Sequence, residues 1–354
     1  MLAREVRLLL VLAAATGLGI STTATAGRTA DGVFPPPLDG VPLTGTTGLQ
    51  LVAASNPPLI VDVDTGRVTQ VRGLDVRGNP VLTVLGAGDA TIVWLERRNA
   101  RRSVPRAEIS VVPNGTDRAT RIATASQVAP SADGDGVWLK THLDRYRCTL
   151  REIALDGSPR ASPRPVPCAT RLVDAGGRAL LHRREAVVDP ATRRVLAAPA
   201  PRLLALAGDV LVTATGQNGS LVLTDLRTGG TRSLDYPSGI HGQGGFGQSI
   251  VDPTGTLVAL EFGDPAYQLS SIQVMDLWLL DTKTASLRQL PDMPAAVSLK
   301  RTSMSWTTDG RLVLLAEVED RALVAVWRPG QERLAVRSLR LPERTSGSDA
   351  FVAR

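Results

Sequence analysis

A short pattern that recurs along the chain decides the fold, and its clearest copy is Val251-Asp252-Pro253-Thr254-Gly255-Thr256-Leu257-Val258-Ala259. A polar turn of Asp, Pro, Thr and Gly is followed at once by an apolar run that is typical of a strand. The pattern returns as Trp306-Thr307-Thr308-Asp309-Gly310-Arg311-Leu312 and, in a shorter form, as Ser131-Ala132-Asp133-Gly134. These copies predict a repeated β-hairpin.

Turns of this kind recur about every 43 residues, which is the length of one four-stranded propeller blade. They are centred near Thr47, Ala87, Ala132, Ala175, Ala207, Asp252 and Thr308. A second marker, Asp-x-x-Thr, follows later in several units and begins at Asp62, Asp189, Asp225 and Asp281. An Asp side chain accepts a backbone N–H two residues on and so opens a hairpin. The fixed order assigns the first marker to the turn between strands A and B of a blade, and the second to the turn between strands C and D.

The apolar segments between these turns are short, and none keeps a helical period over three turns. The chain is therefore expected to be all-β, a β-propeller of seven four-stranded blades. Because the fourth unit is unusually short, a six-bladed ring with one degenerate unit stays open as an alternative. We expect strands at Leu49–Ala54, Leu59–Val63, Thr91–Glu96, Glu108–Val112, Gly136–Thr141, Val210–Thr215, Ser220–Asp225, Leu257–Phe262, Leu277–Asp281, Leu312–Glu317 and Leu323–Trp327.

The two ends of the repeated region complement each other. The first unit lacks an innermost strand before Leu49, whereas the chain ends in the strand-like Ala350-Phe351-Val352. A propeller must close its ring to protect its sheet edges. The C-terminal segment is therefore predicted to supply the innermost strand of the first blade.

The turns at Ser131, Val251 and Trp306 resemble the "Ser-Pro-Asp-Gly, then apolar strand" turns of TolB-type and WD-like (WD40-like) propeller repeat proteins. The resemblance covers Leu49 to Arg354 and concerns architecture, because the Gly-His and Trp-Asp dipeptides of true WD repeats do not recur. It implies a propeller, with binding as the commonest role of the fold, and it points to no particular partner.

The N-terminus has the features of a secretory signal peptide. Arg4 and Arg7 precede the apolar run Leu8–Ile20, and Ala24-Thr25-Ala26 supplies a small-x-small cleavage pattern before Gly27. The run is short for a membrane span, although a retained anchor stays open. The expected organisation is a signal peptide at 1–26, a Pro/Gly-rich lead at 27–48 and the propeller at 49–354. The mature chain is then extracytoplasmic, secreted or associated with the cell envelope, without a membrane span.

The two cysteines fit such an oxidising compartment, where an even pair is expected to form a disulfide bond. In an antiparallel meander, strand C starts on the same face of the ring on which strand D ends. Cys148 begins the C strand of the third unit and Cys168 follows its D segment, Pro163–Pro167. A Cys148–Cys168 bridge is therefore predicted.

The amino-acid composition limits the classes of partner that the chain is expected to bind. The net charge is +6, but only three of the 40 basic residues are lysine and aromatic residues make up 3% of the chain. Basic runs interleaved with aromatic residues are absent, which argues against nucleic acid. The expected partner is a protein or an anionic envelope polymer, bound by a monomer.

The loops B–C and D–A leave each blade on one face, where propellers commonly bind. The B–C loop of the second unit carries Arg97, Arg98, Arg101, Arg102 and Arg106. Guanidinium groups bind phosphate and carboxylate, so this loop is a candidate anion-binding patch. The plainer interpretation is a solvated loop in an Arg-rich protein.

A second candidate lies on the same face. The loop Gly239–Gly247 holds five glycines and His241, and the B–C loop Gly263–Ser271 of the sixth unit holds Tyr267. These loops form either a pocket or a plain linker between blades. His241 also suits acid–base chemistry.

Motifs for catalysis and for metal binding are weak. The three histidines are scattered, and Asp62-x-Asp64-x-Gly66 departs from a calcium loop because its twelfth position is Gly73 instead of Glu. No catalytic residue, metal ligand or cofactor is assigned. The sequence favours a binding or scaffolding module, and the alternative is an extracytoplasmic hydrolase or lyase with its site near His241.

Overall fold

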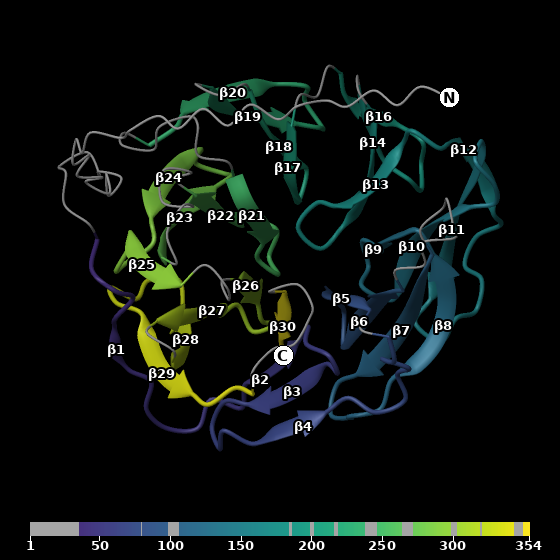
Figure 1. Cartoon of the computed structure of the whole chain (residues 1–354). Helices are drawn as coiled ribbons and strands as arrows, with labels where there is room; N and C mark the ends of the chain where they lie inside the picture. The colour runs from purple at the N-terminus through teal and green to yellow at the C-terminus, as the bar shows by residue number, and fades with distance from the viewer. Residues whose placement is uncertain are drawn as a thin grey trace, which may run out of the picture.

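The computed structural model describes residues 35–78, 80–97, 106–183, 186–198, 202–215, 219–237, 246–263, 272–298, 303–318, 321–342 and 350–354. These residues form seven antiparallel sheets arranged as blades around one axis (Figure 1). The all-β, seven-bladed propeller predicted from the turns is thereby confirmed. The fourth unit forms a blade of its own, so the six-bladed alternative is wrong.

Each blade has four strands, from A near the axis to D at the rim. Blade 1 contains β30 (Phe351–Ala353), β2 (Gln50–Ala53), β3 (Leu59–Asp62) and β4 (Val68–Gln70). Blade 2 contains β5 (Val81–Ala87), β6 (Ala90–Glu96), β7 (Ala107–Pro113) and β8 (Thr120–Ala125). Blade 3 contains β9 (Gln127–Pro130), β10 (Gly136–His142), β11 (Arg147–Ala154) and β12 (Arg164–Pro167). Blade 4 contains β13 (Arg171–Asp174), β14 (Ala179–Arg183), β15 (Ala186–Val188) and β16 (Val195–Ala197).

The remaining blades follow the same order. Blade 5 contains β17 (Arg202–Ala207), β18 (Val210–Ala214), β19 (Ser220–Asp225) and β20 (Thr231–Asp235). Blade 6 contains β21 (Phe246–Val251), β22 (Leu257–Gly263), β23 (Ile272–Asp281) and β24 (Ser286–Gln289). Blade 7 contains β26 (Ser303–Trp306), β27 (Leu312–Val318), β28 (Arg321–Trp327) and β29 (Ala335–Leu339). Two extra strands join them, because β25 (Ala295–Ser298) pairs with β23 and β1 (Val41–Pro42) pairs in parallel with β29.

Both sequence markers occupy the predicted turns. The first marker lies between strands A and B, as at Asp252 between β21 and β22. The second lies between strands C and D, where the Asp Oδ1 accepts backbone N–H groups two and three residues on. In the turn after β19, for example, Asp225 accepts the N–H groups of Arg227 and Thr228 at 2.8 and 3.1 Å. We call the side of the ring that holds these turns the A–B face, and the opposite side the B–C face.

The C-terminal strand closes the ring, as predicted. β30 pairs antiparallel with β2, so that Val352 lies opposite Val52. Two further hydrogen bonds of 2.9 Å join the backbones of Gln50 and Arg354 in both directions. Strands from the two ends of the described chain therefore complete one sheet (Figure 1).

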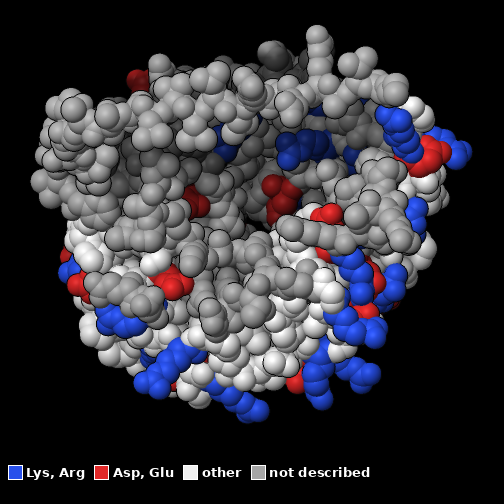
Figure 2. Space-filling view, in the orientation of Figure 1, with Lys and Arg blue, Asp and Glu red and all other residues white. Residues whose placement is uncertain are grey.

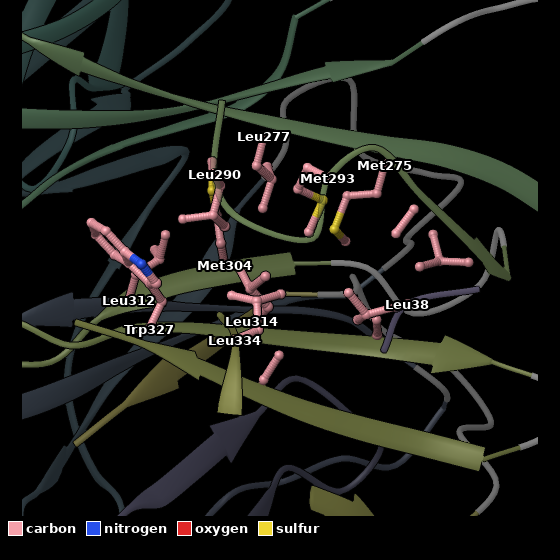
Figure 3. Packing of buried hydrophobic residues seen from close by; sticks show 14 of the residues in the cluster. Leu38, Met275, Leu277, Leu290, Met293, Met304, Leu312, Leu314, Trp327 and Leu334 are labelled. Carbon is pink, nitrogen blue, oxygen red and sulfur yellow. The ribbon is translucent and has the colours of Figure 1, made fainter. Parts of the chain in front are cut away.

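The hydrophobic core is divided among the interfaces between neighbouring blades. The cluster between blades 6 and 7 brings Leu277 and Met275 of β23 against Leu312 and Leu314 of β27, with Trp327 at one end (Figure 3). Polar side chains also link adjacent innermost strands, since Gln248 Oε1 accepts the Met304 N–H at 3.0 Å. The blades are thus joined by apolar packing and by hydrogen bonds near the axis.

The predicted disulfide is present in blade 3. Cys148 on β11 is bonded to Cys168, which follows β12, with their Cα atoms 5.2 Å apart. Cys148 lies opposite Val166 in the strand register, so the meander brings the two sulfurs together. Within the described ranges, no helix has the length and apolar character needed to cross a membrane.

Candidate functional site

Only part of the predicted B–C face belongs to the described residues. Arg98, Arg101 and Arg102 lie outside them, as do His241 and Tyr267. Arg97 and Arg106 are described, and they flank the connection between β6 and β7. The two candidate loops on this face therefore stay predictions.

The described part of the arginine loop is engaged within the protein. Arg97 Nη2 lies 2.6 Å from an Asp75 carboxylate oxygen, and its Nε lies 3.7 Å from Glu108. Hydrogen bonds from Arg77 and Arg97 hold the pKa of Asp75 well below its usual range. The charge of Arg97 is thus balanced by two acids, whereas Arg106 is exposed at the start of β7.

A cavity of about 370 Å³, which the sequence did not reveal, opens at the A–B end of the axis. We call it the axial cavity. Its wall is formed by the innermost strands β5, β21, β26 and β30 and by A–B turns of several blades. Figure 2 shows a hollow at the centre of the ring. The volume lies in the range of small-molecule and peptide pockets.

One A–B turn shapes this cavity. The turn between β13 and β14 reaches toward the centre of the ring (Figure 1). Gly176 in this turn has φ of 82°, and a Cβ atom there would lie 2.3 Å from Val251 Cγ2 of β21. Only glycine permits both this conformation and this close approach. The turn thereby carries the neighbouring Asp174 to the cavity wall.

Asp174 is an acid without a basic partner. Its Oδ1 accepts the Gly177 N–H at 2.6 Å, and among the described residues no cation forms an ion pair with it. Part of the Asp174 side chain is exposed to solvent in the cavity. Desolvation by the surrounding ring nevertheless raises the pKa of its carboxyl, and this effect outweighs the hydrogen bonds from backbone N–H groups of the turn, which lower it. A cationic partner beside such a carboxyl group would stabilise its ionised form.

Arg354 places a basic group in the same wall. Its guanidinium donates to the carbonyl oxygens of Pro113 and Thr116, both at 3.2 Å, and to Asn114 Oδ1 at 3.3 Å. None of these acceptors is a carboxylate, Nε has no hydrogen-bond partner, and burial lowers the pKa of the group. The wall of the axial cavity thus holds one acid and one base, and neither forms an ion pair with another described residue.

Two further acids lie in blade 6. Burial raises the pKa of Glu261 on β22 and of Asp276 on β23. In the register of these strands Glu261 lies opposite Leu277, and Asp276 lies opposite Phe262. Successive residues point to opposite faces of a sheet, so the two acids lie on different faces and do not form a catalytic pair.

One group of metal-ligand type occurs in the described chain. Ligand atoms of His142, Cys148 and Cys168 lie within 4.8 Å of one another. The two sulfurs are bonded to each other, so neither is a thiolate able to hold a metal ion. The disulfide is therefore structural.

No family model matches the chain, and no curated protein matches it. Several solved structures, in contrast, are similar to this chain. A prolyl endopeptidase structure matches 85% of this chain and 50% of its own, with TM-score 0.55 and 11% identity. A protein from Lactobacillus plantarum matches over 87% of this chain and 98% of its own, with TM-score 0.50 and 11% identity. The propeller domain of the Trilobed protease from Pyrococcus furiosus matches over 87% and 99%, with TM-score 0.50 and 12% identity.

These likenesses establish the β-propeller architecture expected from the turns. The chain spans about half the length of the prolyl endopeptidase that it resembles. The Pyrococcus furiosus domain is described as having an open velcro topology, whereas in this chain β30 closes the first blade.

Proposed function

We propose that this chain is an extracytoplasmic binding module that holds a partner at its axial cavity and does not transform it. The observation that carries the proposal is the pair of uncompensated charges, Asp174 and Arg354, in one cavity of about 370 Å³. Binding sites are commonly cavities into which a few polar groups of shifted pKa converge.

The two charges define the partner's chemistry. The carboxylate of Asp174 suits an ammonium or guanidinium group, and the guanidinium of Arg354 suits a carboxylate. A short peptide, or an exposed protein segment with both charges, satisfies both residues. Between the two expected partner classes, a protein or an anionic envelope polymer, the cavity favours the protein. The arginine loop predicted on the opposite, B–C face would instead suit the anionic polymer.

Defined peptides test the proposal. We expect trialanine with free ends to bind more tightly than trialanine acetylated at its N-terminus or amidated at its C-terminus. Asp174→Asn should remove the preference for the free amine, and Arg354→Gln the preference for the free carboxylate, as measured by calorimetry. Equal binding of the free and the doubly blocked peptide, or no binding of either, would overturn the proposal. Melting curves of both variants confirm that they are folded.

An extracytoplasmic location is supported by two features. The disulfide suits an oxidising compartment, and residues 1–26 have the order of a signal peptide. We expect the mature protein to begin at Gly27 and to be recovered from the envelope or the medium. N-terminal sequencing of protein from the native cell decides this, since a chain that begins at Met1 in the cytoplasm would contradict it.

A hydrolase or lyase with a site near His241 is the second candidate. The observation that favours it is Glu261, a buried acid of raised pKa whose carboxylate accepts the Gln248 N–H at 3.0 Å, on the blade that the His241 and Tyr267 loops adjoin. Turnover that is lost in both His241→Ala and Glu261→Gln would favour this candidate over the binding module.

A further inference from the structure

A second cavity, of about 310 Å³, lies on the flank of the ring between blades 3 and 4. It is bounded by β12 of blade 3 and by β14, β15 and β16 of blade 4. The outer strands of blade 4 have three residues each, so they leave part of the facing blade uncovered. We call this cavity the flank pocket.

The floor of the flank pocket is apolar. Val166 of β12 faces Leu181 and Val188 of blade 4, and all three belong to the hydrophobic cluster between these blades. Val195 at the rim is 56% exposed, a high value for a valine in a strand. Leu181 and Val188 are themselves only 3% and 7% exposed, so the apolar surface that stays open to the pocket belongs mainly to Val166 and Val195.

Three arginines surround this floor, namely Arg164, Arg183 and Arg193. The Arg164 guanidinium lies over the Trp138 ring, 5.3 Å from its centroid. Within the described ranges, none of the three forms an ion pair. In the sector where Figure 1 places β12, Figure 2 shows both basic and acidic side chains at the rim of the ring.

Among the described acids, Asp189 acts on Arg164 but does not neutralise the three arginines. Asp189 is already paired with Arg178 at 2.9 Å, and it also accepts the N–H groups of Ala191 and Thr192. Burial and the positive charge of Arg193 both lower the pKa of Arg164, while Asp189 offsets this only in part. The like charges therefore repel one another, and an anion between them would relieve that repulsion.

The backbone at Arg193 adds independent support. Its φ is 62°, in the left-handed region that favours glycine. The equivalent position of the C–D turn is Gly66 in blade 1 and Gly229 in blade 5, both with positive φ, and the small Ala285 in blade 6. Any residue with a Cβ atom, Arg193 and Ala285 alike, costs about 1 kcal/mol or more relative to glycine in this conformation. At Arg193 this conformation holds a guanidinium at the mouth of the pocket.

We propose that the flank pocket binds a small amphipathic carboxylate, whose apolar body lies against Val166 and Val195 and whose carboxylate is held by Arg164 and Arg193. A planar guanidinium matches a carboxylate in two parallel hydrogen bonds. The apolar floor requires the attached hydrocarbon, and the volume limits its size. The site is separate from the axial cavity, so the two proposals stand or fall independently.

Calorimetry with octanoate tests the proposal, with octanamide and acetate as probes that lack the charge or the hydrocarbon. We expect octanoate to bind and the other two to bind at least about tenfold more weakly. The Arg164→Gln, Arg193→Gly double variant should lose at least about tenfold in octanoate affinity. Arg67→Gln, at an exposed arginine of the C–D turn of blade 1, is the matched control and should leave binding unchanged.

A second readout separates binding from folding. Arg193→Gly alone should weaken octanoate binding and raise the melting temperature, because glycine removes the backbone strain. A merely structural arginine would not produce this combination. Equal affinity of octanoate and octanamide, unchanged binding in the double variant, or binding only to vesicles of anionic phospholipid and not to octanoate would each overturn the proposal.

Discussion

At the scale of single residues, Asp64 shows how one carboxylate joins distant parts of the ring. It lies in the C–D turn of blade 1 and accepts the N–H groups of Thr47 and Gly48 just before β2. It also pairs with Arg337 of β29 at 2.7 Å, and Arg337 donates to the Leu43 carbonyl next to β1. Blade 1, blade 7 and the N-terminal lead therefore meet at one ion pair.

The first prediction concerns the pH dependence of this contact. Partial burial by itself would raise the pKa of Asp64, but hydrogen bonds from Thr47, Gly48 and Arg337 outweigh it and bring the pKa to about 2, below the ordinary 3.8. The carboxylate therefore stabilises the fold fully above pH 4, and this contribution is lost as the pH falls through 2. Asp64→Asn should lower the free energy of unfolding at pH 7 by about 1 to 2 kcal/mol after allowance for solvent screening.

Urea unfolding of both proteins between pH 7 and pH 2 checks this expectation. The difference between wild type and Asp64→Asn should shrink toward pH 2, because protonation removes the same charge from the wild type. A difference that stays constant over this range would contradict the role given to the carboxylate.

The second prediction concerns the residue after Thr in the C–D turns. Gly229 has φ of 75°, and nothing lies within 4 Å of the position of an added Cβ. Gly229→Ala should therefore cost about 1 kcal/mol through backbone strain alone. Ala285, with φ of 52° at the same turn position, should respond in the opposite sense, so that Ala285→Gly raises the melting temperature. Thermal melts of the two variants that shift in the same direction would rule out this explanation.

At the scale of elements, the sequence predicted the features that depend on neighbouring residues, namely the hairpin turns and most of the strands. Each Asp-x-x-Thr marker encodes its own hairpin, because the Asp oxygen and the N–H groups it accepts lie within three residues. Strand β23 was predicted from Leu277 only, yet it begins at Ile272, because its first half pairs with β25 and its second half with β24. That exchange of partners depends on a distant segment, which local patterns do not report.

The disulfide gives the third prediction, which concerns blade 3. The bond closes a loop of 20 residues between β11 and the end of β12, and loops of this length confer about 3 kcal/mol in the chain-entropy view. The Cys148→Ser, Cys168→Ser variant should be destabilised by about that amount. Hydrogen exchange should speed first in residues 147–167. Equal stability and equal exchange in the two proteins would show that the bridge constrains nothing.

At the scale of the whole molecule, the site was harder to predict than the ring. The period of the turns is a property of the sequence, so it predicted a propeller and favoured seven blades over six. The axial cavity arises where A–B turns of several blades converge, and Asp174 meets it only because Gly176 allows a close approach to Val251. The glycines of that turn are visible in the sequence, but their partner across the axis is not.

The fourth prediction tests closure. Deletion of residues 347–354 removes β30, which exposes the edge of β2 and uncovers the cluster that contains Phe351. The unfolding midpoint of the entire ring should fall, and a synthetic peptide of residues 347–354 should restore it. An unchanged melting temperature after the deletion would show that the ring does not depend on this strand.

The central claim is that the chain binds a partner through its axial cavity. Affinity capture from the native cell envelope tests it most directly, with tagged residues 27–354 as the bait. Three baits are compared: the wild type, the cavity variant Asp174→Asn, Arg354→Gln, and a four-arginine variant. The four-arginine variant has Arg97, Arg98, Arg101 and Arg102 changed to alanine. We predict a partner that the wild type and the four-arginine variant retain and that the cavity variant loses. A partner retained by the cavity variant, or no partner held by the wild type, would contradict the claim.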